Sequence, residues 1–140
     1  MAIYYVATPQ ITVGDSPVDL SDHLLEATLT YEADEIETTS SGTATTTKSY
    51  IAGLKSWKVD ATFQQDYAAS KVDATLEPLV GAAPFAVTLK PTSAAKSATN
   101  PEYSGDCILT SYPCMSGKVS ELATVKVTFR GTGALGRATV

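Results

Sequence analysis

The sequence contains a single histidine, His23, within the segment SDHLLE. A catalytic triad or an acid–base pair that uses imidazole would have to be built on this residue. The segment precedes a strongly alternating stretch, and Ser21 can accept hydrogen bonds from free backbone amides. We therefore interpret His23 as a polar residue of a one-turn helix capped by Ser21.

Paired carboxylates are the second candidates for acid–base chemistry, and Asp34, Glu35 and Glu37 lie close together. Adjacent residues of an extended chain point to opposite faces, so Asp34 and Glu35 cannot act as a pair. Glu35 and Glu37 can share a face and could hold a cation, but their spacing does not match a calcium-binding loop. These residues indicate a solvated rim.

Cysteine and glycine patterns also fail to predict a site. Cys107 and Cys114 are too few for a disulfide scaffold and lack the partners of a zinc site. We favour two reduced thiols, with a disulfide as the alternative. The glycine-rich segment GTGALG, residues 131–136, follows the last predicted strand with no room for the helix of a dinucleotide site. We expect no enzyme activity, no metal and no cofactor.

Composition favours one folded domain over residues 1–140. Hydrophobic residues make up 44% of the chain and charged residues 18%, enough for one packed core. The net charge of −5 and the pI near 4.7 argue against tight binding of nucleic acid. No apolar run is long enough for a membrane-spanning helix, and we expect a soluble intracellular product without a membrane partner.

Alternation of apolar and polar residues is the dominant structural signal. It runs through residues 25–33, 57–63 and 123–129, and shorter strands are expected at 3–7, 11–13, 85–90 and 107–112. The pattern predicts a mainly β, antiparallel fold. The predicted core comprises Leu29, Tyr31, Trp57, Val59, Phe63, Val72, Leu76, Val125 and Phe129.

Other segments depart from this alternation. Residues 66–80 place apolar side chains three and four positions apart, which predicts one helix capped by Asp66. Residues 38–48, TTSSGTATTTK, are small and polar and are expected to form a mobile loop in the lone monomer. Residues 91–101 indicate a surface loop bounded by prolines. Residues 131–140 are expected to form a flexible tail, and Arg130 and Arg137 could reach a neighbouring subunit.

The order of several segments carries a family resemblance. They are VDLSDHL, YEADEIETT before the Ser/Thr loop, IAGLKSWKVDATFQQDYAASKVDATLEPLVG, LKPTSAAKSATNPEYSG and SGKVSELATVKVTF. From about Asp19 to Phe129 the chain resembles the small tail tube (major tail) proteins of long-tailed bacteriophages. The resemblance implies an antiparallel β-sandwich or barrel with a flanking helix. It also implies hexameric rings that stack into a tube through which DNA passes.

This resemblance implies a virion tail subunit, made and assembled in the bacterial host cytoplasm, with itself as main partner. Tape measure, terminator and distal tail proteins are implied as further partners, and DNA would pass without specific binding. A capsid decoration protein or a tail-terminator or connector ring component is the alternative. The implied inter-ring contact comprises Thr38, Thr39, Ser40, Ser41, Gly42, Thr43, Thr45, Thr46, Thr47, Lys48 and Tyr50. The lumen face is assigned to Lys58, Asp60, Thr124 and Lys126, although either polar face could be the outer surface.

Overall fold

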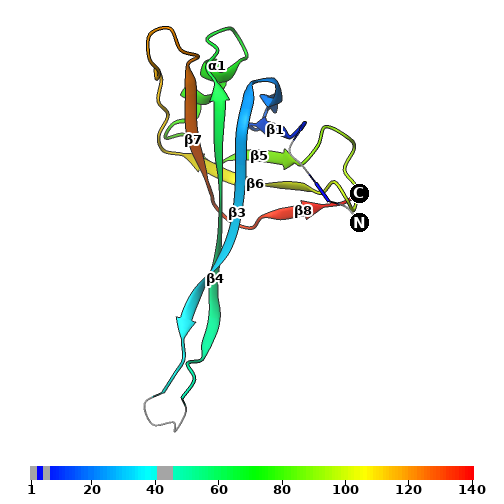
Figure 1. Cartoon of the computed structure of the whole chain (residues 1–140), viewed down its shortest axis with the longest axis vertical. Coiled ribbons are helices and arrows are strands. Elements are labelled where there is room, and N and C mark those ends of the chain that lie inside the picture. Colours follow the sequence, from blue (N-terminus) through cyan, green and yellow to red (C-terminus); the bar gives the residue numbers. More distant parts are fainter. Residues whose placement is uncertain (1–2, 5–6, 41–45) are drawn as a thin grey trace.

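The computed structural model describes residues 3–4, 7–40 and 46–140 of the chain. Within these residues, one antiparallel sheet of eight strands carries most of the fold, with one short α-helix beside it (Figure 1). The prediction of a mainly antiparallel β fold with one helix is confirmed. In chain order the elements are β1 (Gln10–Val13), β2 (Val18–Asp19), the 3₁₀ turn η1 (Ser21–His23), β3 (Leu24–Glu37), β4 (Tyr50–Gln64), α1 (Val72–Leu76), the 3₁₀ turn η2 (Glu77–Leu79), β5 (Phe85–Lys90), β6 (Glu102–Leu109), β7 (Thr124–Gly131) and β8 (Gly136–Ala138).

The sheet bends sharply at β6. Its strand order is β2-β1-β5-β6-β7-β4-β3, and β8 pairs with β6 beside this path. Residues 107–109 of β6 pair with β7, whereas residues 102–104 pair with β8. Figure 1 shows β5, β6 and β8 running across the direction of β3, β4 and β7. Because of this bend, side chains of β1 and β5 meet those of β4 and β7 in one buried cluster.

The core is largely the one that the alternation predicts. Seven of the nine predicted core residues are 2% exposed or less, and they are Trp57, Val59, Phe63, Val72, Leu76, Val125 and Phe129. Leu29 is half-buried and packs against this cluster. The prediction for Tyr31 is wrong, since its side chain is 52% exposed. Tyr31 lies opposite Trp57 in the β3–β4 register, where β3 is the outermost strand and β7 no longer pairs with β4.

A β-bulge changes the start of β3. The register shifts between Leu24 and Glu26, so that Leu24 lies opposite Phe63 and packs against the core. Leu25, which strict alternation places on the buried face, is instead 50% exposed. An extra residue at a bulge exchanges the two faces of the sheet for the residues that precede it in the strand. This single shift explains why Leu24, and not Leu25, packs against the core.

The helix is much shorter than predicted. It begins at Val72 rather than at Asp66, and its buried residues are Val72 and Leu76. The Asp66 carboxylate does not cap it but accepts a hydrogen bond from the Ala68 N–H at 2.9 Å. Ser70 has a φ of 61°, a left-handed conformation that a right-handed helix cannot include.

The C-terminal residues form part of the sheet rather than a free tail. Residues 136–138 form β8 against β6, and Leu135 packs against the core. The Trp57 indole N–H donates to the carbonyl of Gly133 at 3.1 Å. A Cβ at Gly131 would lie 2.2 Å from Cε2 of Trp57. The glycine-rich segment therefore gives the indole a surface to pack on.

Candidate assembly surface

The distal halves of β3 and β4 form a two-stranded arm that extends away from the rest of the sheet (Figure 1). We define the arm as residues 31–40 and 46–57. Strand β7 pairs with β4 only over residues 58–64, and β3 is the outermost strand. Both edges of the arm therefore lack a neighbouring strand within the described part of the chain. Open edges are templates for pairing with another chain, and an isolated two-stranded ribbon is only marginally stable.

Apolar side chains are exposed on both strands of the arm, and one of these strands, β3, is also rich in acidic residues. Ile36 lies directly opposite Ile51, both are exposed, and Leu54 is 81% exposed. Tyr31 and Tyr50 add two exposed aromatic rings. Exposed apolar groups gathered on one element are typical of protein contact sites. The acidic residues of the arm are Glu32, Asp34, Glu35 and Glu37, and its lysines are Lys48 and Lys55.

The residues predicted to contact the next ring lie at the free end of the arm. The Thr38 N–H donates to the Ser49 carbonyl at 2.8 Å, and the Ser49 N–H donates to Thr39 Oγ1 at 2.8 Å. Tyr50 lies opposite Glu37 in the β3–β4 register. Ser40, Thr46, Thr47 and Lys48 are exposed beyond the strands. Ser41, Gly42, Thr43 and Thr45 lie outside the described residues.

The four residues assigned to a lumen share the face of β4 and β7 that points away from the core. Lys58 and Asp60 alternate with the buried residues of β4, and Thr124 and Lys126 alternate with those of β7. The Lys58 Nζ lies 3.8 Å from Asp60 Oδ2, and the Thr128 hydroxyl donates to Asp60 Oδ1 at 2.6 Å. The structure thus brings the four residues onto one polar surface.

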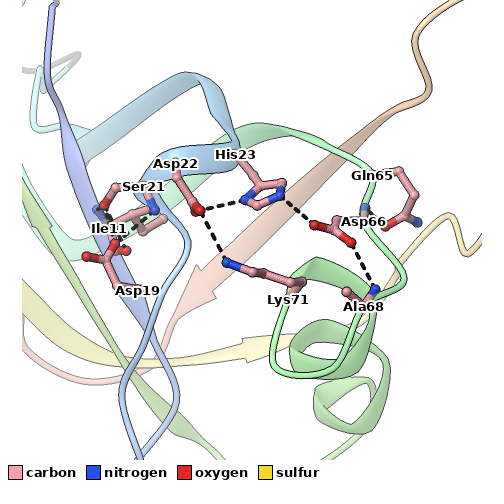
Figure 2. Close-up of polar contacts among 9 residues, drawn as sticks. All are labelled: Ile11, Asp19, Ser21, Asp22, His23, Gln65, Asp66, Ala68 and Lys71. Carbon is pink, nitrogen blue, oxygen red and sulfur yellow. Dashed lines mark hydrogen bonds and ion pairs between the residues drawn. The ribbon is translucent and has the colours of Figure 1, made fainter.

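His23 lies between two carboxylates (Figure 2) and directly precedes β3, at the end of that strand away from the arm. Its Nδ1 is 2.8 Å from Asp22 Oδ1, and its Nε2 is 2.8 Å from Asp66 Oδ2. Ionised carboxylates only accept hydrogen bonds, and a neutral imidazole donates from only one nitrogen. This geometry therefore favours the imidazolium. Above all, the hydrogen bond with Asp22 raises the pKa of His23, and burial opposes the shift in part.

The surroundings of His23 make it a structural ion-pair centre. Lys71 Nζ lies 3.3 Å from Asp22 Oδ2, so the cluster joins η1 to the turn before α1. Ser21 makes no capping bond, contrary to prediction, and its Oγ accepts from the Ile11 N–H at 3.0 Å. Since carboxylates engage both ring nitrogens, neither is free to take a proton from a nucleophile.

The remaining candidates for chemistry are dispersed. Among the described residues, no three His, Cys, Asp or Glu side chains lie close enough together to hold a metal ion. Cys107 and Cys114 are both free, the first buried and the second exposed. Burial raises the pKa of the Cys107 thiol to about 12, which keeps it protonated and unreactive at neutral pH. In the same part of the chain, no helix has the length and apolar character needed to cross a bilayer.

Sequence reasoning missed a groove at the base of the arm. It has a volume of about 340 Å³ and is lined by Leu29, Tyr31, Leu89, Tyr103 and Leu135, among others. Its lining comes from β3, β5, β6, the turn before β8 and the segment before β1, where Tyr4 and Pro9 line it. The bend of the sheet brings these elements together. The alternation marks these residues as apolar, but carries no signal that they share a surface left partly open.

Comparison with solved structures defines the class of fold, which is shared with chains of gene transfer agent particles and of a contractile injection system. One chain of the virion of a native gene transfer agent particle shares 13% identity with this chain at a TM-score of 0.74, covering 94% of this chain and 95% of its own. A chain from the tail of an empty gene transfer agent particle with C6 symmetry shares 13% identity at a TM-score of 0.65, covering 83% and 82%.

A third match comes from a contractile particle. A chain in the extended sheath–tube complex of PVC, an extracellular contractile injection system, shares 11% identity at a TM-score of 0.70, covering 99% of this chain and 93% of its own. No protein-family model and no curated protein matches the sequence. At this low identity the matches establish a shared fold. As a statement about the fold, the resemblance to tail tube proteins is confirmed.

Proposed function

We propose that the chain is a structural subunit of a phage-like tail, which polymerises with copies of itself into stacked rings that form a tube. The observation that carries this proposal is the arm, with two open strand edges and exposed apolar side chains on a chain whose fold is shared with tail components. Pairing of the open edge of β3 with a neighbour would satisfy its free backbone groups. The subunit acts by assembly and has no enzyme activity.

A ring of six subunits and a DNA conduit form the finer part of the proposal. The C6 symmetry of the gene transfer agent tail supports six copies. Six subunits with a net charge of −5 each carry −30 per ring, so the ring as a whole does not attract DNA phosphates, while the four residues assigned to the lumen include two lysines and one aspartate. The face bearing Lys58, Asp60, Thr124 and Lys126 lines the lumen in this arrangement. The subunit resides in the virion tail, with other tail proteins bound at the tube ends.

The free end of the arm makes the contact between rings. Deletion of residues 39–47 tests this role, because these residues lie beyond Glu37 and Tyr50, the last paired residues of β3 and β4. A matched control replaces the same residues with an equal number of glycines and serines, which keeps the length but not the side chains. Negative-stain microscopy of the purified proteins is expected to show tubes for the wild type and only rings or dispersed particles for the deletion. Tubes of wild-type length from the deletion variant would refute the role of the loop.

A further inference from the structure

The turn between β4 and α1, residues 65–71, is exposed and strained. Residues 67–70 are all exposed, and Tyr67 is 61% exposed. Ser70 has a φ of 61°, a left-handed conformation that costs free energy for a residue with a side chain. A segment that buries little apolar surface opens locally at low cost. The order of this turn therefore depends on the polar bonds that tie it to its neighbours.

Two ion pairs tie the turn to η1 (Figure 2). Asp66 Oδ2 lies 2.8 Å from His23 Nε2, while Asp66 Oδ1 accepts the Ala68 N–H at 2.9 Å. Lys71 Nζ lies 3.3 Å from Oδ2 of Asp22, whose Oδ1 lies 2.8 Å from His23 Nδ1. Both ends of the turn are therefore joined to the Asp22–His23 pair, which directly precedes β3.

The charges of this cluster balance only while the imidazole is protonated. Among the described residues, the charged groups around the ring are Asp22 of η1 and Asp66 and Lys71 of the turn. Asp73 of α1 is bonded elsewhere, since it accepts the Tyr112 hydroxyl at 2.9 Å. A neutral imidazole donates from one nitrogen only, so one carboxylate then faces a lone pair at 2.8 Å. Loss of the proton thus weakens the attachment, whichever nitrogen keeps its hydrogen.

The turn also supports a second exposed segment, residues 110–123. The Gln65 Nε2 donates to the Cys114 carbonyl at 3.1 Å, and the Tyr67 hydroxyl donates to the same carbonyl at 2.7 Å. Three large apolar side chains of this segment are 65% exposed or more, and they are Met115, Val119 and Leu122. A change in the order of the turn therefore changes the support of an exposed apolar surface.

We infer that His23 is a proton-dependent latch, which holds the turn 65–71 against η1 while the imidazole is protonated and loosens it when the proton leaves. The hydrogen bond with Asp22 raises the pKa of His23 above its usual value of about 6.5. The latch is therefore closed below that value and opens as the pH rises through the folded pKa. It needs no second copy, so it goes beyond the proposed function and holds for the single subunit.

Methyl NMR of alanine-labelled protein tests the latch, at concentrations low enough to suppress assembly. An alanine methyl is bonded to Cα and reports backbone order, and its signal survives at high pH. The order parameters of Ala68 and Ala69 should fall from about 0.85 to below about 0.6 between pH 6 and 9. The fall should share its midpoint with the titration of the His23 ring. Ala61, which is 1% exposed in β4, should keep its value.

Two variants separate the latch from other effects of pH. His23 is the only histidine of the chain, so His23→Gln should leave Ala68 and Ala69 equally ordered at pH 6 and 9. Asp60→Asn is the matched control, since it removes a carboxylate that pairs with Lys58 on the polar face of β4, and it should keep the pH dependence. Order parameters that stay constant in the wild type, or that fall equally in His23→Gln, would overturn the inference. An equal fall at Ala61 would also overturn it, because the whole domain would then be loosening.

Discussion

The contact between Trp57 and Gly131 allows a quantitative test of the core. A Cβ at Gly131 would lie 2.2 Å from Cε2 and 2.3 Å from Cδ2 of Trp57, well inside the roughly 3.5 Å at which carbon atoms meet. The indole cannot move aside freely, because it also packs over Gly105 and donates to Gly133. Gly131→Ala should therefore lower the free energy of unfolding by about 1 to 3 kcal/mol through overpacking.

The same substitution should be nearly silent once the indole is gone. Trp57 is 2% exposed, so Trp57→Ala should cost about 3 to 5 kcal/mol through loss of burial and formation of a cavity. In that variant the added methyl of Gly131→Ala projects into the cavity. The double variant should thus be no less stable than Trp57→Ala, which gives a coupling of about 1 to 3 kcal/mol.

Urea unfolding followed by far-ultraviolet circular dichroism measures these free energies, at protein concentrations low enough to suppress assembly. Gly136→Ala is the matched control, since its Cβ would meet nothing closer than the Ser104 carbonyl oxygen at 3.4 Å. It should change stability by less than about 1 kcal/mol. Additive costs for Trp57→Ala and Gly131→Ala would refute the packing of the indole on this glycine.

Two further predictions concern titration and thiol reactivity. Because the folded state raises the pKa of His23, its stabilising effect should be complete below the unfolded value of about 6.5 and be lost as the pH rises through the folded value. The difference in melting temperature between wild type and His23→Gln should shrink as the pH is raised from 6 to 9. A constant difference would contradict an imidazolium that is hydrogen-bonded to a carboxylate at each ring nitrogen. The lowered pKa values of Asp22 and Asp66 act in the opposite sense, with stabilisation lost as the pH falls through their folded values. A maleimide reagent should label exposed Cys114 in the native protein and Cys107 only after unfolding. Mass spectrometry that finds native Cys107 labelled as fast as Cys114 would show that the core opens readily.

Alternation correctly predicted the strands whose inner faces form the core, for a clear physical reason. Residues 58–63 of β4 have a neighbouring strand on each edge, and residues 124–129 of β7 pair with β4. Both stretches have a covered inner face, so the apolar positions of the sequence are the buried positions of the structure. Tyr31 follows the same pattern but lies where β3 leaves the body. A local pattern indicates which side chains share a face of a strand. It does not indicate whether another part of the protein covers that face.

Helical spacing misled for a related reason. Tyr67 and Ala69 fit the apolar stripe of a helix, yet they belong to an exposed turn held by the Asp66 carboxylate and by the left-handed Ser70. Turn chemistry of Asp and Ser competed with helix formation and prevailed. The contact of Trp57 with Gly131 depends on a pairing of distant segments, so spacing along the chain could not indicate it.

The arm was visible in the sequence only through its loop. The composition of residues 38–48 marked a segment that cannot bury surface, and this segment lies between two of the predicted strands. The length of the arm depends on where β7 stops pairing with β4, and that is a property of the whole folded sheet. The mobility of this loop in the lone monomer stays a prediction.

Cryo-electron microscopy of the purified wild-type protein, without other tail components, tests the central claim most directly. The account predicts hollow tubes of stacked rings, with the arm of each subunit in contact with a second copy. Dispersed monomers at high concentration, or closed particles in which every arm projects freely into solvent, would contradict it.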